Sequence, residues 1–196
     1  MKFGFQMDPV STLNHSTDST LPMILESQKR KNQNYIFSPS SLTFKKSSLY
    51  AQAKEIKFKN DKLNSYTLSS EKKLNLNSLN YIFIRQDPPY DMEYISSMHL
   101  LEQLSEKTKV VNSPSGIRNA PEKILMLKFK NIIPPTLITR SKKEIDRFMN
   151  SYKKSVIKPL YGNGGQGIFL LDKNDKNYNQ IIEKFIDEDS VPFIVQ

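Results

Sequence analysis

The stretch from Ser155 to Leu171 constrains the fold of this chain more than any other, because it joins two apolar runs through a cluster of glycines. Four of the six glycines in the 196-residue sequence fall there. The cluster reads Gly162, Asn163, Gly164, Gly165, Gln166 and Gly167. The dinucleotide fingerprint and the P-loop both need a helix that begins at the glycines, whereas residues 168–171 are apolar and β-rich. The stretch therefore predicts a strand–loop–strand hairpin.

Such a hairpin can hold a ligand, because glycine has no side chain and the backbone N–H groups of the loop can therefore approach phosphate groups closely. Protein kinases and ATP-grasp enzymes both use one. The kinase alternative fails on order, since a kinase needs its lysine on a following strand and a later His-Arg-Asp loop. A hairpin without a ligand is the other alternative, although four glycines exceed the one or two that a tight turn needs.

Lys158 is the candidate cation beside this hairpin. It lies just before the glycines, in an apolar run with Val156, Ile157 and Leu160. A lysine on such a strand, next to a glycine loop, suits a phosphate group. The alternative is a solvated lysine on an edge strand.

Residues 1 to about 115 alternate between strand-like and helix-like patterns. Strands are expected at residues 3–7, 35–38, 81–84 and 110–111, and helices at 21–31 and 93–107. This order favours an α/β fold with a parallel, doubly wound sheet. The weak pattern of residues 42–76 predicts a small hairpin insertion of exposed strands at the sheet edge, and residues 113–116 are expected to form a linker.

The remaining residues read as part of an α+β unit. A helix is expected from Ala120 to about Lys130 with Asn119 as its N-cap, and a capping box at residues 141–144 predicts a second helix to about Ser151. A third helix at 178–185 and a last strand at 191–196 complete the pattern. Because the sequence stops on an apolar run, we expect it to end within a domain.

Four polar residues follow the strands of the first region. Asp18 and Ser19 lie in the loop after the first strand, and Arg85 and Asp87 follow the strand at 81–84. Open α/β sheets bind ligands at the carboxyl ends of their strands, so these residues are candidate substrate ligands. The alternatives are a helix cap for Asp18 and Ser19 and a mutual ion pair for Arg85 and Asp87.

Composition excludes several classes of function. The sequence has no cysteine, so it has no disulfide, thiolate zinc site or cysteine nucleophile. No apolar segment approaches the length of a membrane span, and the N-terminus lacks a signal-peptide pattern, so we expect a cytoplasmic protein. The net charge of +9 is spread along the chain with acids interleaved, which argues against a nucleic-acid partner.

Several short segments, in order, resemble those of prokaryotic glutathione synthetase, an ATP-grasp ligase. They are Met7-Asp8-Pro9, Asp18-Ser19-Thr20, Arg85 to Asp91 (RQDPPYD), Val111-Asn112, Glu122-Lys123, Thr136 to Arg140 (TLITR), Lys158-Pro159-Leu160 and Gly162 to Gly165. Each alone is weak, whereas their common order is specific. Among ATP-grasp ligases, the Arg-x-Asp-Pro-Pro segment is what points to glutathione synthetase.

The resemblance implies an N-terminal pre-ATP-grasp domain over residues 1–118 and the first part of a truncated ATP-grasp domain over 119–196. It implies that Lys123 and Lys158 contact ATP, that the glycine loop covers the phosphates, and that Gln196 reaches the adenine-binding hinge. The Mg²⁺ ligands of the family have no counterpart in this sequence.

The activity implied is the ATP-dependent ligation of glycine to γ-glutamylcysteine through an acyl phosphate, and the family suggests a homo-oligomer. This chain by itself is expected to be incomplete for catalysis. Two alternatives stay open: another ATP-grasp carboxylate–amine ligase, and a non-catalytic nucleotide-binding or assembly module.

Overall fold

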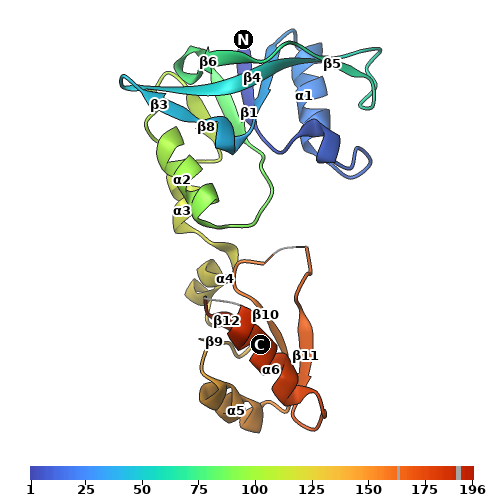
Figure 1. The fold of residues 1–196 in the computed structure, drawn as a ribbon, viewed down its shortest axis with the longest axis vertical. Helices are drawn as coiled ribbons and strands as arrows, with labels where there is room; N and C mark the ends of the chain where they lie inside the picture. Colours follow the sequence, from blue (N-terminus) through green and yellow to red (C-terminus); the bar gives the residue numbers. More distant parts are fainter. Residues whose placement is uncertain (163, 189–190) are drawn as a thin grey trace. The chain divides into compact units, whose positions relative to one another are not determined.

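The computed structural model describes residues 1–162, 164–188 and 191–196, and for Glu188 it describes only the backbone. These residues form two compact units, residues 1–119 and 120–196 (Figure 1). Each unit has its own sheet and its own buried apolar clusters.

The first unit is built on a parallel sheet, as the sequence predicts. Its parallel strands occur in the order β2-β1-β7-β8, with bounds β1 (Lys2–Gln6), β2 (Gln33–Phe37), β7 (Tyr81–Ile84) and β8 (Lys109–Val111). Helix α1 (Thr20–Lys29) packs into the cluster that contains Phe5. Helix α2 (Met92–Leu101) packs into the cluster that contains Ile82 and Ile84. Because neighbouring strand residues point to opposite faces, the two helices cover the two faces of a doubly wound sheet.

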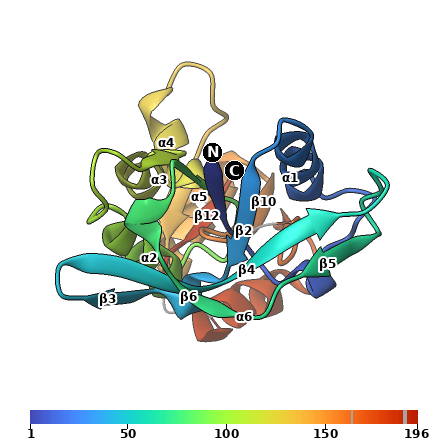
Figure 2. The same ribbon diagram turned by 90° about the horizontal axis from the view of Figure 1, so that it is seen from above.

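The segment from 42 to 76 extends the edge of the parallel sheet, as predicted, but its main strand is long and largely buried instead of exposed. A single long strand, β4 (Ser48–Phe58), runs through it and pairs antiparallel with β2 inside the sheet. Shorter strands pair with β4 in turn, β3 (Thr43–Lys45) and β6 (Lys72–Asn75) toward one end and β5 (Tyr66–Leu68) toward the other (Figure 2).

The burial of β4 explains the error. Leu49, Ala51 and Ala53 belong to the cluster on the α2 side, whereas Ile56 and Phe58 belong to the cluster on the α1 side. The buried positions therefore change from odd to even along one strand. Because one alternation of apolar and polar residues does not continue along the whole strand, the sequence indicates this strand only weakly.

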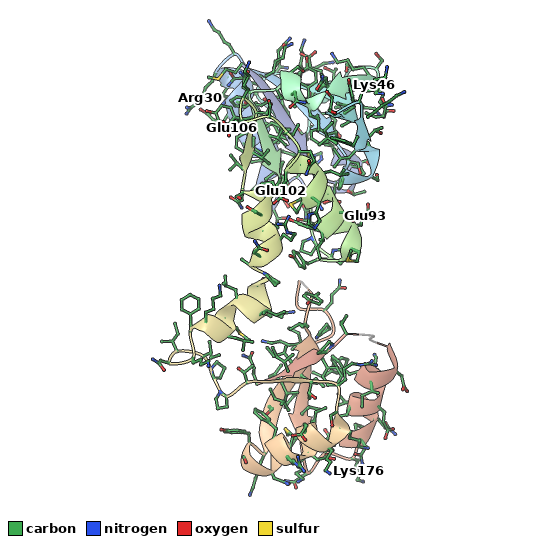
Figure 3. All side chains as sticks on the ribbon, turned by 90° about the vertical axis from the view of Figure 1, so that its left-hand side faces the viewer. Arg30, Lys46, Glu93, Glu102, Glu106 and Lys176 are labelled. Atoms are coloured by element: carbon green, nitrogen blue, oxygen red, sulfur yellow. The ribbon has the colours of Figure 1, made fainter. Side chains whose placement is uncertain are left out.

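Two expectations at the end of this unit are wrong. Helix α2 stops at Leu101 rather than near residue 107, since the amides of Gln103 and Leu104 bond to carbonyls only three residues back. The expected linker at 113–116 is the start of helix α3 (Pro114–Asn119). Ser113 Oγ accepts a hydrogen bond of 3.2 Å from Gly116 N. Arg118 of α3 pairs with Glu102, which follows α2 and is labelled in Figure 3.

The second unit contains a four-stranded antiparallel sheet in the order β11-β10-β12-β9. The strands are β9 (Leu137–Thr139), β10 (Lys154–Pro159), β11 (Phe169–Asp172) and β12 (Phe193–Val195). Helices α5 (Lys142–Ser151) and α6 (Tyr178–Glu188) contribute Ile145, Met149 and Ile182 to a single cluster on one face of this sheet. This arrangement is the predicted α+β pattern (Figure 1).

The helix predicted from Ala120 to about Lys130 is shorter than expected. Asn119 ends α3 instead of capping a new helix, and α4 (Glu122–Leu125) begins after Pro121. A 3-10 turn, η4 (Met126–Lys128), follows it directly. Three other 3-10 turns lie in the first unit: η1 (Val10–Thr12), η2 (Pro39–Ser41) and η3 (Leu76–Ser78). Among the described residues, no helix is both long and apolar enough to span a membrane.

Candidate functional site

The glycine-rich stretch forms the predicted hairpin. Strands β10 and β11 pair antiparallel, with Ile157 opposite Phe169 and Ser155 opposite Leu171, and the glycines lie in the connection between them. Gly164, Gly165 and Gly167 have φ values of 61°, 76° and 69°, in the region that favours glycine. Gln166 is exposed in the same turn, and Asn163 lies outside the described residues.

Lys158 lies on the sheet face opposite the α5–α6 cluster. In an antiparallel sheet, residues directly opposite each other share a face. Lys158 stands opposite Ile194, which stands opposite Ile138, whereas the neighbouring row that contains Ile157 and Val195 packs into the cluster. Lys158 is partly buried, and it shares its face with Leu170, which is 62% exposed.

Lys123 comes to the base of the hairpin from the first turn of α4. Its ammonium donates hydrogen bonds to Pro159 O at 2.6 Å and to Gly162 O at 2.7 Å. The pKa of Lys123 lies below its ordinary value, mainly because burial disfavours the charged form and next because Lys158 is nearby. Among the described residues, no carboxylate forms an ion pair with either lysine. Two like charges thus lie close together beside the glycines.

Gln196 extends the same face. Its backbone N–H and C=O both bond to Val156, which lies two residues before Lys158 on the strand, so Gln196 shares the sheet face of Lys158. The side-chain amide donates to Thr136 Oγ1 at 2.9 Å and contacts Met126 Sδ at 3.5 Å. Thr136 and Met126 were not identified from the sequence. Thr136 is two residues before Ile138, so its place on this face follows once the strand pairing is known.

The candidate substrate residues of the first unit divide into two roles. Arg85 follows β7 and donates to Ser19 Oγ at 2.7 Å and to Thr20 Oγ1 at 3.1 Å, which joins the end of β7 to the start of α1. Asp18 caps α1, since its Oδ1 accepts from Thr20 N and Leu21 N, each at 2.8 Å. The expected capping by Ser19 is absent, because its hydroxyl bonds to Arg85 instead.

Asp87 does not pair with Arg85. Among the described residues no ion pair links the two, and Asp87 N donates instead to Asp8 Oδ2 at 2.7 Å. Asp8 lies two residues after β1. It was named only within the segment Met7-Asp8-Pro9 and not as a candidate ligand, although an acid at a strand end is the pattern that identified Asp87. A small cavity of about 130 Å³ lies here, lined by Asp8, Asp87 and Tyr94 among others. The pKa of Tyr94 is raised, first by burial and then by Tyr90.

A larger cavity, of about 480 Å³, lies on the β2 and β4 side of Asp8. Met7, Ile36 and Phe37 make part of its wall apolar, and Lys54 and Glu71 lie at its edge. The described residues contain no group of three histidines and acids that could hold a metal ion.

The sequence matches two family models: "Prokaryotic glutathione synthetase, N-terminal domain" over residues 1–118 and "Prokaryotic glutathione synthetase, ATP-grasp domain" over residues 122–196. It is 40% identical to the glutathione synthetase of Agrobacterium fabrum, over 98% of this chain and 60% of that protein. It is 37% identical to that of Mesorhizobium japonicum, over 100% of this chain and 63% of that protein. The chain thus spans about three fifths of the length of these relatives.

The fold also resembles solved structures with little sequence similarity. A RimK domain protein ATP-grasp from Sphaerobacter thermophilus superimposes with a TM-score of 0.62 at 15% identity, over 100% of this chain and 63% of that one. At this identity the likeness concerns the fold alone, which is that of an ATP-grasp protein.

Proposed function

Because this chain belongs to the prokaryotic glutathione synthetase family, we propose that it takes part in the ATP-dependent ligation of glycine to γ-glutamylcysteine, with its own residues supplying the nucleotide-binding face and part of the substrate site. In this reaction the substrate carboxylate accepts the γ-phosphoryl group as an acyl phosphate, and the glycine amine then displaces phosphate. Such chemistry depends on positioning and charge neutralisation and needs no protein nucleophile.

The observation that carries the proposal is the pair of lysines beside the glycine hairpin. Lys158 is close enough to Lys123 to lower its pKa, and neither has an acidic partner among the described residues. The charge of the neighbouring Glu122 acts on Lys123 more weakly than that of Lys158, so the two ammonium groups still favour the negative charge that a triphosphate supplies. The amides of Gly164 and Gly165 lie in the same hairpin and can donate to phosphate oxygens.

In this proposal Gln196 and Met126 flank the base of the nucleotide, because Gln196 lies on the sheet face of Lys158 and its side chain contacts Met126 Sδ. Arg85, held by Ser19 and Thr20, is proposed to clamp a substrate carboxylate. Mg²⁺ would need several oxygen ligands, and the described residues contain no group of three histidines and acids that could supply them. A cytoplasmic location and a homo-oligomer are further parts of the proposal.

The test is to remove Lys158 in the 196-residue chain and measure MgATP binding by isothermal titration calorimetry. We expect Lys158→Ala to weaken binding by about tenfold or more, since a charged hydrogen bond is worth roughly 1.5–3 kcal/mol. The matched control is Lys154→Ala. Lys154 lies on the same strand but pairs with Asp172 at 3.5 Å and is exposed.

The control should bind MgATP as the unaltered chain does, and both variants should keep its thermal unfolding midpoint. Equal affinities of Lys158→Ala and Lys154→Ala for MgATP would contradict the proposal.

A further inference from the structure

The glycines of the hairpin fall into two kinds. A Cβ atom added to Gly167 would lie 3.0 Å from Pro159 Cγ and 3.2 Å from Pro159 Cδ. One added to Gly162 would lie 3.1 Å from Pro159 Cβ. Around Gly164 and Gly165 an added Cβ would meet nothing within 4 Å. The two outer glycines are thus packed on one proline ring, whereas the two inner ones face open space.

The same proline is fixed from the backbone side. Lys123 Nζ donates to Pro159 O and to Gly162 O at once, so one ammonium holds both ends of the segment that leads into the glycines. Pro159 also stands opposite Phe193, which is fully buried in the sheet. A rigid ring with a fixed φ, anchored in this way, can act as a platform for a turn that has no side chains of its own.

We propose that Pro159 is the positioning residue of the glycine hairpin: its ring sets the position of Gly162 and Gly167, which leaves Gly164 and Gly165 free to approach a ligand. The identity of that ligand as a nucleoside triphosphate rests on the proposed function; the packing on Pro159 does not. Gly162 and Gly167 therefore lack a side chain so that they can pack on Pro159, and Gly164 and Gly165 lack one so that their backbone can approach a ligand.

The experiment is a double-mutant cycle in the 196-residue chain, read by hydrogen exchange of the β10 and β11 amides. Gly167→Ala and Gly165→Ala form a matched pair, because both place a side chain at positive φ and only the first meets the proline ring. We expect Gly167→Ala to increase hairpin opening about fivefold or more beyond Gly165→Ala. In a Pro159→Ala background that excess should disappear, since the clashing Cγ and Cδ atoms are gone.

An equal excess for Gly167→Ala in both backgrounds would overturn the proposal, and so would a dependence of Gly165→Ala on Pro159. MgATP titration of the same variants then separates the two claims. Gly165→Ala is expected to weaken MgATP binding without the excess opening. If the unaltered chain shows no MgATP binding, the proposed function fails for this chain, while the exchange cycle still decides the role of Pro159.

Discussion

The two sheets of this protein use their faces differently. The first unit packs an apolar cluster on each face of its sheet, and its polar candidates, Arg85, Asp8 and Asp87, stand at the strand ends. The second unit packs one cluster on one face, and its lysine lies on the other face, in the middle of the sheet. A parallel sheet buried on both sides has only its strand ends available to a ligand, whereas this antiparallel sheet also has part of its second face, around Lys158, available.

The largest loss of stability is expected from a substitution that tests whether the two units unfold independently. Phe193 is fully buried in the single cluster of the second unit and packs on Phe185 at a centroid distance of 5.4 Å. Phe193→Ala should cost about 3–5 kcal/mol and unfold residues 120–196 first. Hydrogen exchange should then show loss of protection in β10 while β1 stays protected.

The matched variant for that experiment is Phe5→Ala, at a buried phenylalanine in a cluster of the first unit. It should give the reverse pattern, with β1 exposed and β10 protected. A loss of protection in both units on either substitution would show that the comparison between two independent sheets is wrong.

A smaller loss of stability is expected at the contact between helices α5 and α6 of the second unit. Tyr178 of α6 donates to Asp146 Oδ1 of α5 at 2.9 Å. Tyr178→Phe should lower the free energy of unfolding by about 1.5–3 kcal/mol, because the bond is to a carboxylate. Tyr152→Phe, at an exposed ring that ends α5, is the control and should change little. Urea unfolding measures both, and equal losses would contradict this role.

The same tyrosine predicts a pH dependence. Burial first, and then the hydrogen bond and charge of Asp146, raise the pKa of Tyr178 well above its ordinary value of 10.0. The unfolded chain therefore ionises this group at a lower pH than the folded chain does. Its contribution is fully present below about pH 10 and is lost as the pH rises above that value. The stability difference between the unaltered chain and Tyr178→Phe should accordingly shrink above pH 10.

The smallest loss of stability is expected at the start of helix α1 in the first unit. Asp18→Ala should cost about 1 kcal/mol, because the carboxylate caps two amides of α1. Asp18→Asn should keep most of that stability, since asparagine also caps helices well. Thermal unfolding of the first unit measures the difference. If Asn costs as much as Ala, capping is not the reason for an acid at this position.

The glycine hairpin and the parallel sheet could be predicted because their signals are local. Clustered glycines followed by a β-rich run exclude a helix, and the order of strands and helices indicates a doubly wound sheet. Helix α3 was within reach of the same rules, since Ser113 followed by Pro114 is a recognisable helix start.

The rest depends on pairing between distant segments. Nothing near Thr136 or Gln196 in the sequence indicates that they bond to each other, because the contact arises only once β9, β10 and β12 form one sheet. Lys123 is a similar case, since its partners Pro159 and Gly162 lie in a different part of the sequence. The roles of Lys123, Lys158, Arg85 and the glycines in binding stay predictions.

The buried positions of β4 change from odd-numbered to even-numbered residues along the strand, and this affects the cooperativity with which the first unit folds. Leu49, Ala51 and Ala53 serve one cluster, and Ile56 and Phe58 serve the other. A slip of the strand by one residue would turn both sets outward together, and no alternative register can satisfy one core at the expense of the other. A single strand thus locks the two sides of the first sheet into one folding unit, although the clusters themselves lie on opposite faces.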